Sequence, residues 1–366
     1  MFTAKKPNSI VGLDIETGTI AATEVRASGS REVARTAIVP LEDGIVNEGE
    51  IRNPDALSDA LRSAFSKNKL GKTVRLGIAN QMVVVRTLRL PLIEDDEERE
   101  TAVRFQAQDQ IPMPLDQAVL DHHVISRDDG PEGQRQMDVV AVAARRDMVS
   151  SLLAALRKAG LRPVGIDLSA FGMLRALGTD QVLGSNGGPS EASGDPGSEQ
   201  LPQPTTLYAH LGDITNLAVA RGAQCLFTRI APFGLENIAA RLAEGESMPL
   251  EDAREWIVDV GLDDSLDEFV SNRETAAAAQ EALSEGAKKL VDELRVSMEF
   301  YSAQEGAPPI ERVVLCGPGS TIPGLPEHVQ AGLGLGLESM TPPALAHLDE
   351  EDAARLTVSY GLALEA

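Results

Sequence analysis

The chain has 366 residues, of which 43% are hydrophobic, and this is more than one typical core holds, so we expect two or three domains. Its formal charge of −23 at pH 7 excludes nucleic acid as a partner, because binding to phosphates needs clustered Lys and Arg, and it also argues against direct attachment to an anionic membrane. Aromatic residues make up only 3%, so no platform for stacking bases is expected.

The sequence predicts a cytoplasmic protein that uses its cysteines neither for disulfides nor for metal. No stretch approaches the roughly 20 apolar residues of a membrane span, and no signal-peptide core follows Met1. Cys225 and Cys316 lie in apolar strand patterns, where a free thiol behaves as a small hydrophobic group. His122 and His123 are adjacent, so along a strand they point to opposite faces and cannot share an ion.

The first element is a hairpin over residues 10–26, with the sequence IVGLDIETGTIAATEVR. Asp14 ends its first strand, and a polar turn from Glu16 to Thr19 leads into the second strand. A turn that contains Gly and Thr can point several backbone N–H groups into one concavity, which suits a phosphate. The alternative is an ordinary buried hairpin, since a short turn of this kind is a weak signal.

Residues 32–79 continue an α/β unit. A third strand is expected over 32–40, and a fourth over 74–79. Between them a helix begins at Pro54, with Asn53 as its N-cap, and extends to about Lys69.

Residues 81–159 predict a small α+β module. The acidic run from Glu94 to Glu98 is interpreted as the charged start of a helix with a solvated face, because acids in the first turn favour the helix dipole. The expected elements are a strand (81–90), a helix (97–110), two strands (117–127 and 136–144) and a second helix (147–159).

A short strand (163–167) and a helix (169–177) follow, and an N-cap role for this helix is one interpretation of Asp167. From Gly178 to Pro204 the chain is rich in Gly, Ser and Pro, and this composition cannot bury enough surface to order itself. We therefore expect a flexible linker that joins two halves of the chain.

The second half repeats the opening design. Residues 205–229 predict strand, polar turn and strand, with Gly212, Asp213 and Thr215 at the turn, and a third strand after it. A helix starts near Gly234, and Trp256 is interpreted as the anchor of a small helical subdomain. A long helix over about 274–304 has apolar residues at helical spacing.

Near its end the chain runs from a strand (313–316) into a glycine-rich loop that contains Gly317, Gly319 and Ser320. Glycine permits close approach of a ligand to the backbone, because it has no side chain to clash.

The order hairpin, hairpin, then strand and glycine loop resembles the phosphate-1, phosphate-2 and adenosine segments of the actin, Hsp70 and hexokinase superfamily. Within it, the chain is most similar to the PilM family of type IV pilus assembly, which is related to FtsA. The similarity lies in LRLP (88–91), VRFQAQDQIPMP (103–114), VVAVAAR (139–145), RVSMEFY (295–301) and YGLAL (360–364).

The resemblance implies an α/β, two-lobed actin-like (ribonuclease H-like) ATPase fold with an inserted small α+β subdomain. The first lobe would comprise residues 1–86, 165–180 and 340–366, and the inserted subdomain residues 87–164. A linker (181–204) would precede the second lobe (205–339), whose helical subdomain would span about 236–304. Asp167 would fall in the connecting element that returns to the first lobe.

The resemblance also implies ATP between the lobes, with Asp14 holding Mg²⁺ through water. Thr17, Gly18 and Thr19 would contact the β- and γ-phosphates, and the second turn would close from the other side. The full set of implied nucleotide-binding residues is Asp14, Thr17, Gly18, Thr19, Gly212, Asp213, Thr215, Gly234, Lys289, Glu293, Gly317, Gly319 and Ser320, of which Lys289 and Glu293 would border the adenine.

Four positions depart from the family pattern near this ligand. Glu16 stands where the family has Gly, and His210 where it has Asp. Leu235 and Pro318 each replace the second glycine of a Gly-Gly pair, and Pro318 lacks an N–H donor. A like-charge contact at about 4 Å costs roughly 1 to 4 kcal/mol, so we expect degraded ATP binding and no efficient catalysis.

The preferred function is therefore a cytoplasmic scaffold of type IV pilus assembly. In the resembled family, the groove between the inserted subdomain and the main lobe receives the N-terminal tail of the inner-membrane protein PilN, and such a partner would recruit this chain to the membrane. A homo-oligomer is also compatible with the family. One alternative is an ATPase or small-molecule kinase, for which Asp213 is the only nearby catalytic carboxylate. Another is an FtsA-like division filament, disfavoured because the sequence reaches Ala366 without an amphipathic membrane helix.

Overall fold

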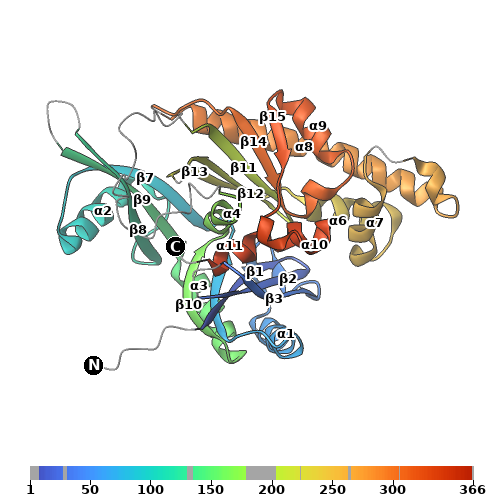
Figure 1. Cartoon of the computed structure of the whole chain (residues 1–366), viewed down its shortest axis with the longest axis horizontal. Helices are drawn as coiled ribbons and strands as arrows, with labels where there is room; N and C mark the ends of the chain where they lie inside the picture. The colour runs from blue at the N-terminus through green and yellow to red at the C-terminus, as the bar shows by residue number, and fades with distance from the viewer. Residues whose placement is uncertain are drawn as a thin grey trace.

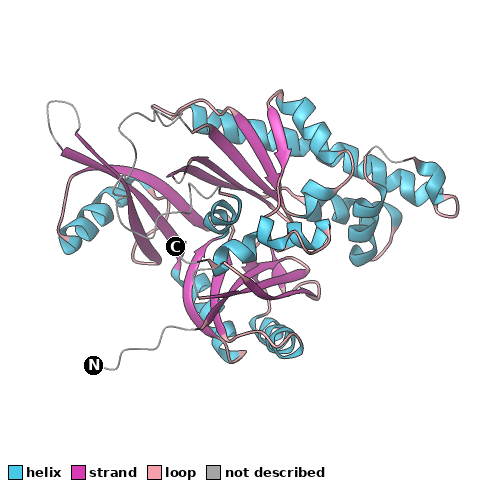
Figure 2. Ribbon diagram, in the orientation of Figure 1, coloured by secondary structure: helices cyan, strands magenta, loops and turns pink. Residues whose placement is uncertain are grey.

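The computed structural model describes residues 8–27, 31–129, 135–178, 203–222, 224–262, 265–304 and 306–364. Residues 181–202 of the expected linker lie outside this range. Figures 1 and 2 show two lobes built on separate sheets, with a third, smaller sheet at one side of the molecule. No helix in the described part is both long and apolar enough to cross a membrane.

The first lobe is built on a five-stranded sheet in the order β10-β6-β1-β2-β3. The predicted hairpin forms its centre, because β1 pairs antiparallel with β2 and parallel with β6. The strands are β1 (Ser9–Glu16), β2 (Thr19–Arg26), β3 (Val33–Pro40), β6 (Thr73–Ile78) and β10 (Arg162–Leu168), and β4 (Val46–Asn47) pairs with β5 (Glu50–Ile51) beside them.

Two pairs of helices pack on this sheet. Helix α1 (Pro54–Lys67) packs against α3 (Arg146–Lys158), and α4 (Ser169–Leu177) packs against α11 (Thr357–Ala363). Helices α4 and α11 lie between the sheets of the two lobes (Figure 1). The first lobe is thus completed by a helix from the far end of the described chain.

Glycines allow α11 to approach its neighbours closely. A Cβ on Gly12 of β1 would lie 1.9 Å from the Ser359 carbonyl oxygen, and one on Gly361 would lie 1.7 Å from the Gly172 carbonyl oxygen. The hydroxyl groups of Thr23 and Ser359 share a hydrogen bond of 2.7 Å in the same contact. Backbone therefore packs directly on backbone at this junction.

The third sheet has the order β7-β9-β8 and is antiparallel, formed by β7 (Val83–Pro91), β8 (Ala118–Asp129) and β9 (Arg135–Arg145). Helix α2 (Asp96–Gln110) packs on it through Val103 and Ala107. The Asp95 side chain accepts the Glu98 N–H and caps α2, which confirms the acidic run as a helix start. Helix α3 falls inside the expected insertion (87–164), yet it packs with the first-lobe core through Leu152 and Leu156.

The second lobe has a five-stranded sheet in the order β13-β12-β11-β14-β15. Its strands are β11 (Thr205–Leu211), β12 (Thr215–Arg221), β13 (Gln224–Ala231), β14 (Arg312–Cys316) and β15 (Gly336–Ser339). Its helices include α6 (Leu235–Glu246), α7 (Leu250–Val260), α8 (Arg273–Ser302) and α9 (Leu325–Leu333), and α10 (Glu350–Arg355) leads back to α11. Trp256 packs on Phe269 with ring centroids 5.8 Å apart, as expected of an anchor among these helices.

One local prediction is wrong. Asp167 does not cap α4, because the N-cap position is Leu168 and no side chain accepts a hydrogen bond there. The Asp167 carboxylate instead accepts the Leu168 N–H. It also pairs with Arg175, which lies in the last turn of α4. Asp167 lies one residue before the N-cap position. A sequence pattern does not locate the start of a helix to within one residue.

Candidate functional site

The β1–β2 turn lies at the junction of the two lobes. Asp14 pairs with Ala21 inside the hairpin, and Glu16 ends β1 opposite Thr19. Gly18 has a φ of +82°, a conformation that favours glycine, and the Arg254 guanidinium lies 3.0 Å from where its Cβ would be. The turn is therefore tight and is covered by a cation from the other lobe.

The two predicted turns meet. The Thr17 N–H donates to Asp213 Oδ2 at 2.7 Å, and Asp213 Oδ1 accepts the Ile214 N–H at 2.7 Å. Because a turn of this kind offers its N–H groups to a phosphate oxygen, Asp213 acts as an internal acceptor at one position that a phosphate would need.

Three carboxyl groups meet in this contact, where Asp14 and Asp213 are buried and Glu16 is half-buried. Burial raises the pKa of Asp14 to about 7, although the Ser169 hydroxyl donates to it at 3.2 Å. Burial, together with the neighbouring Asp213 and Asp14, raises the pKa of Glu16 well above its usual value. Burial also raises the pKa of Asp213, against the opposing effect of the Thr17 N–H. The site thus disfavours negative charge, including that of an incoming phosphate.

His210 is the fourth titratable group of this contact. Its Nδ1 lies 3.7 Å from Glu16 Oε1, and burial lowers the pKa of His210 to about 4. The imidazole is therefore neutral at pH 7, and the contact is not an ion pair. Its Nε2 is buried and has no hydrogen-bond partner among the described residues.

The glycines predicted to line the cleft pack against these side chains. A Cβ on Gly212 would lie 2.2 Å from Glu16 Oε1, and one on Gly317, whose φ is +80°, would lie 2.7 Å from the His210 ring. The Ser320 hydroxyl donates to the Gly317 carbonyl oxygen at 2.7 Å, and Gly319 packs on Leu211. The glycine loop is therefore packed against side chains of the second lobe, where a ligand was expected.

The remaining predicted residues divide into two groups. Thr215 donates to the Phe233 carbonyl oxygen at 2.7 Å, and Gly234 packs on the backbone of Asp213, so both support the second turn. Lys289 lies 5.8 Å from the Phe233 ring centroid, and Glu293 lies 3.5 Å from Arg229. These last two do not line the cleft between the turns.

The cleft between the turns has a volume of only about 20 Å³, room for about one water molecule. Among the described residues, no group of three His, Cys, Asp or Glu could hold a metal ion. The site in this closed arrangement therefore does not fit Mg²⁺ with a nucleoside triphosphate.

Arg254 joins the lobes at the edge of this cleft, and this role was not predicted from the sequence. Its guanidinium is 2.8 Å from Asp43 of the first lobe and 2.6 Å from Glu236 of its own lobe. In the sequence Arg254 belongs to a charged helix face, which is typical of a solvated surface.

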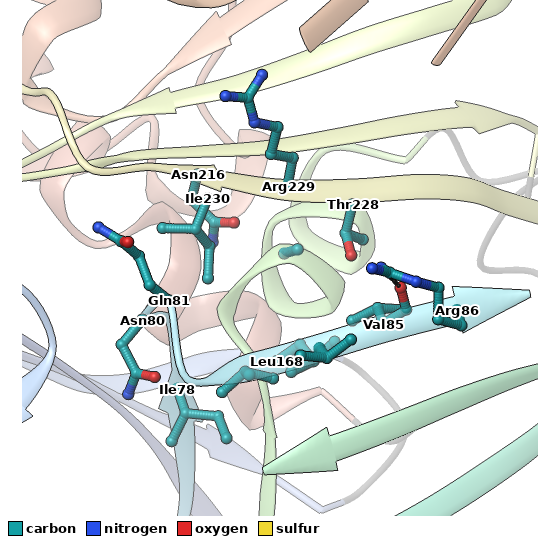
Figure 3. Close-up of a pocket in the computed structure, with 13 residues that line it drawn as sticks. Ile78, Asn80, Gln81, Val85, Arg86, Leu168, Asn216, Thr228, Arg229 and Ile230 are labelled. Carbon is teal, nitrogen blue, oxygen red and sulfur yellow. Dashed lines mark hydrogen bonds between the residues drawn. The ribbon is translucent and has the colours of Figure 1, made fainter. Parts of the chain in front are cut away.

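A larger cavity of about 280 Å³ lies between β7 and β13 (Figure 3). Its walls come from all three sheets or from the segments that follow them. It is lined by Ile78, Asn80, Gln81, Val83, Val84, Val85, Arg86, Leu168, Ala170, Asn216, Thr228, Arg229 and Ile230. Asn216 also lines the small cleft, so one side chain touches both spaces.

Comparison with known proteins identifies the family of this chain and structures of the same fold. The model of a family described as type IV pilus assembly protein PilM matches residues 12–366. The chain is similar to the solved "PilM-PilN type IV pilus biogenesis complex", with 25% identity over 98% of both chains and a TM-score of 0.76.

Two other solved structures show the same fold. The ethanolamine utilization protein EutJ from Carboxydothermus hydrogenoformans has 15% identity over 98% of this chain and 90% of its own, with a TM-score of 0.54. MreB5 of Spiroplasma citri bound to ADP has 14% identity over 98% and 95%, with a TM-score of 0.50. The expected two-lobed actin-like fold is therefore confirmed.

Proposed function

The chain belongs to the family of the type IV pilus assembly protein PilM, and on that premise we propose that it is an actin-like scaffold that docks the N-terminal tail of a PilN-like inner-membrane protein. The observation that carries the proposal is the similarity to the PilM-PilN complex across 98% of both chains. The scaffold works at the inner face of the cytoplasmic membrane, where its partner holds it. The family match does not favour a kinase or a division filament.

The tail docks in the 280 Å³ cavity between β7 and β13. Strands β7 and β13 are edge strands of two different sheets and lie against each other across this cavity. An edge strand presents unpaired N–H and C=O groups, which an extended peptide can use. The division of the chain into a lobe, an insertion over 87–164 and a second lobe is part of this proposal, but the β7 residues that line the cavity, 83–86, precede that boundary.

Fluorescence anisotropy tests the docking proposal. The probe is a labelled synthetic peptide with the sequence of the N-terminal tail of the PilN-like protein from the same organism. Thr228→Trp, which fills the cavity from β13, is expected to weaken binding at least tenfold, whereas Thr87→Trp on the exposed side of β7 leaves it unchanged. Absence of binding to the unaltered protein would refute the scaffold proposal.

The second part of the proposal is that the chain binds nucleotide only weakly. The implied ligand residues around Asp14, Thr17 and Asp213 become accessible only when the lobes open, because they now contact each other. Calorimetric titration with Mg·ATP should show tighter binding to the double variant Glu16→Gly, His210→Asp than to the unaltered chain. Tight binding with turnover by the unaltered chain would contradict this.

A further inference from the structure

The cavity between β7 and β13 has an unusual charge for this protein. The chain contains 56 acidic residues against 33 basic ones, yet none of the described residues that line the cavity is Asp or Glu, whereas Arg86 and Arg229 both line it. Strand β7 supplies Arg86 and strand β13 supplies Arg229, from opposite walls. A positive cavity in an acidic protein favours an occupant with negative charge.

The two arginines differ in how their charge is balanced. Arg229 donates to Ser297 at 3.0 Å and lies 3.5 Å from Glu293, and its side chain is directed away from β7 (Figure 3). Arg86 donates to the carbonyl oxygen of Val85 at 2.8 Å, and no carboxylate among the described residues pairs with it. Arg86 is therefore the cation that remains available to a ligand in this cavity.

Asn216 provides a second, independent sign of a ligand. It is only 3% exposed, and its Nδ2 is buried without a hydrogen-bond partner among the described residues. An unpaired buried donor costs roughly 1 to 3 kcal/mol. Because Asn216 lines the cavity, an occupant with an acceptor group at that wall would satisfy the Nδ2 donor.

The surfaces near these two donors are apolar. Val83 and Val85 contribute from β7, Ile230 from β13, and Ile78 with Leu168 from the first lobe. An extended segment that lies along the edge of β7 places alternate side chains on opposite sides, so apolar and acidic residues can face different walls.

We propose that the docked tail binds through an aspartate or glutamate that pairs with Arg86, and through a carbonyl oxygen that accepts a hydrogen bond from Asn216 Nδ2. This inference rests on the docking function proposed above and adds the residues that select the partner. An Arg–carboxylate pair is a charge-assisted and often bidentate contact, so it contributes specificity as well as affinity.

The test uses the full chain and the labelled tail peptide. Arg86→Ala is expected to weaken binding about tenfold or more, since hydrogen bonds to charged groups contribute about twice as much as neutral ones. Arg89→Ala is the matched control, because Arg89 is on the same strand but does not line the cavity. A peptide in which the paired acid is replaced by its amide should lose the same affinity, and Arg86→Glu should be rescued by a peptide with Lys there.

A second variant tests the buried donor. Asn216→Ala should weaken peptide binding several-fold, and it should not lower the melting temperature, because the Nδ2 group has no protein partner to lose. A fall in melting temperature with unchanged peptide affinity would show that Asn216 has only a structural role.

The outcomes separate the two proposals. No binding of any tail peptide would refute the docking function itself. Binding that responds equally to Arg86→Ala and Arg89→Ala, or that uses a segment without an acid, would leave docking intact and overturn this inference. Self-association of the free protein that Arg86→Glu abolishes would assign the cavity to a second copy of the chain and would also overturn it.

Discussion

At the scale of single residues, the main feature is that acidic side chains occupy the contact between the turns. Asp213 accepts the Thr17 N–H, and Glu16 fills the space beside Gly212. The sequence predicted that Glu16 would oppose a phosphate by charge repulsion. The structure adds a second effect, because Glu16 and Asp213 also fill the space that a phosphate would need.

His210 predicts a pH dependence of stability. Its pKa is lowered to about 4 by burial, against an ordinary value of 6.5, so between pH 6.5 and 4 the unfolded chain binds more protons than the folded one. The contribution of His210 to the free energy of unfolding should therefore fall as pH decreases through this range, by at most about 1.4 kcal/mol per pH unit. The raised pKa values of Asp14, Glu16 and Asp213 act in the opposite direction. In urea unfolding at several pH values, the free energy of unfolding of the unaltered protein should fall relative to that of His210→Phe as the pH decreases. Parallel curves would show that His210 does not titrate on unfolding.

At the scale of secondary-structure elements, much of the fold was predictable. The hairpins at Asp14 and Asp213 and the loop at Gly317 were recognised from short-range pattern, since strand alternation and turn residues are local properties. The packing of α3 on the first lobe and the facing edges of β7 and β13 were not predicted. These depend on which faces of distant elements meet, and a local pattern does not contain that information.

The same limit applies to the candidate site. Asp14, Thr17 and Asp213 were expected in one cleft, and they lie together. Arg254 and Asn216 were missed, because a helix-surface arginine and a strand asparagine carry no signal until the other lobe is in place.

The junction of β1, α4 and α11 predicts an unequal effect of two glycine substitutions in helices. Gly361→Ala should destabilise the protein by about 3 kcal/mol or more, because the new methyl group would lie 1.7 Å from a backbone oxygen. Gly245→Ala in α6 has nothing within 4 Å and should be neutral or stabilising by up to about 1 kcal/mol. Thermal unfolding of both variants measures the difference. Equal melting temperatures would show that α11 moves apart from α4 at little cost.

At the scale of the whole molecule, two hydrogen-bonded contacts join the lobes at the cleft. One is the hydrogen bond from Thr17 to Asp213, and the other is the pairing of Arg254 with Asp43 and Glu236. The closed cleft is therefore maintained by the protein's own groups.

Removing the second contact should open the molecule. Arg254→Ala removes the partly exposed ion pair with Asp43, which contributes about 1 kcal/mol. The equilibrium between closed and open lobes should shift about fivefold toward the open state. Small-angle X-ray scattering should show a larger radius of gyration for this variant. Arg241→Ala, which removes a pair with Glu285 inside the second lobe, is the control and should leave the radius unchanged. An unchanged radius for both variants would mean that the Thr17 contact suffices.

The backbone contact of α11 with β1 also determines when the first lobe is completed during synthesis. Thr23 meets Ser359, 336 residues later, so the lobe whose strands leave the ribosome first remains unfinished until almost all of the described chain has emerged. The β7-β9-β8 sheet needs only nearby residues and is able to fold much earlier. A nascent chain therefore exposes its candidate peptide-binding strand β7 before the lobe beside it exists, and correct assembly requires that this edge stay unpaired in the meantime.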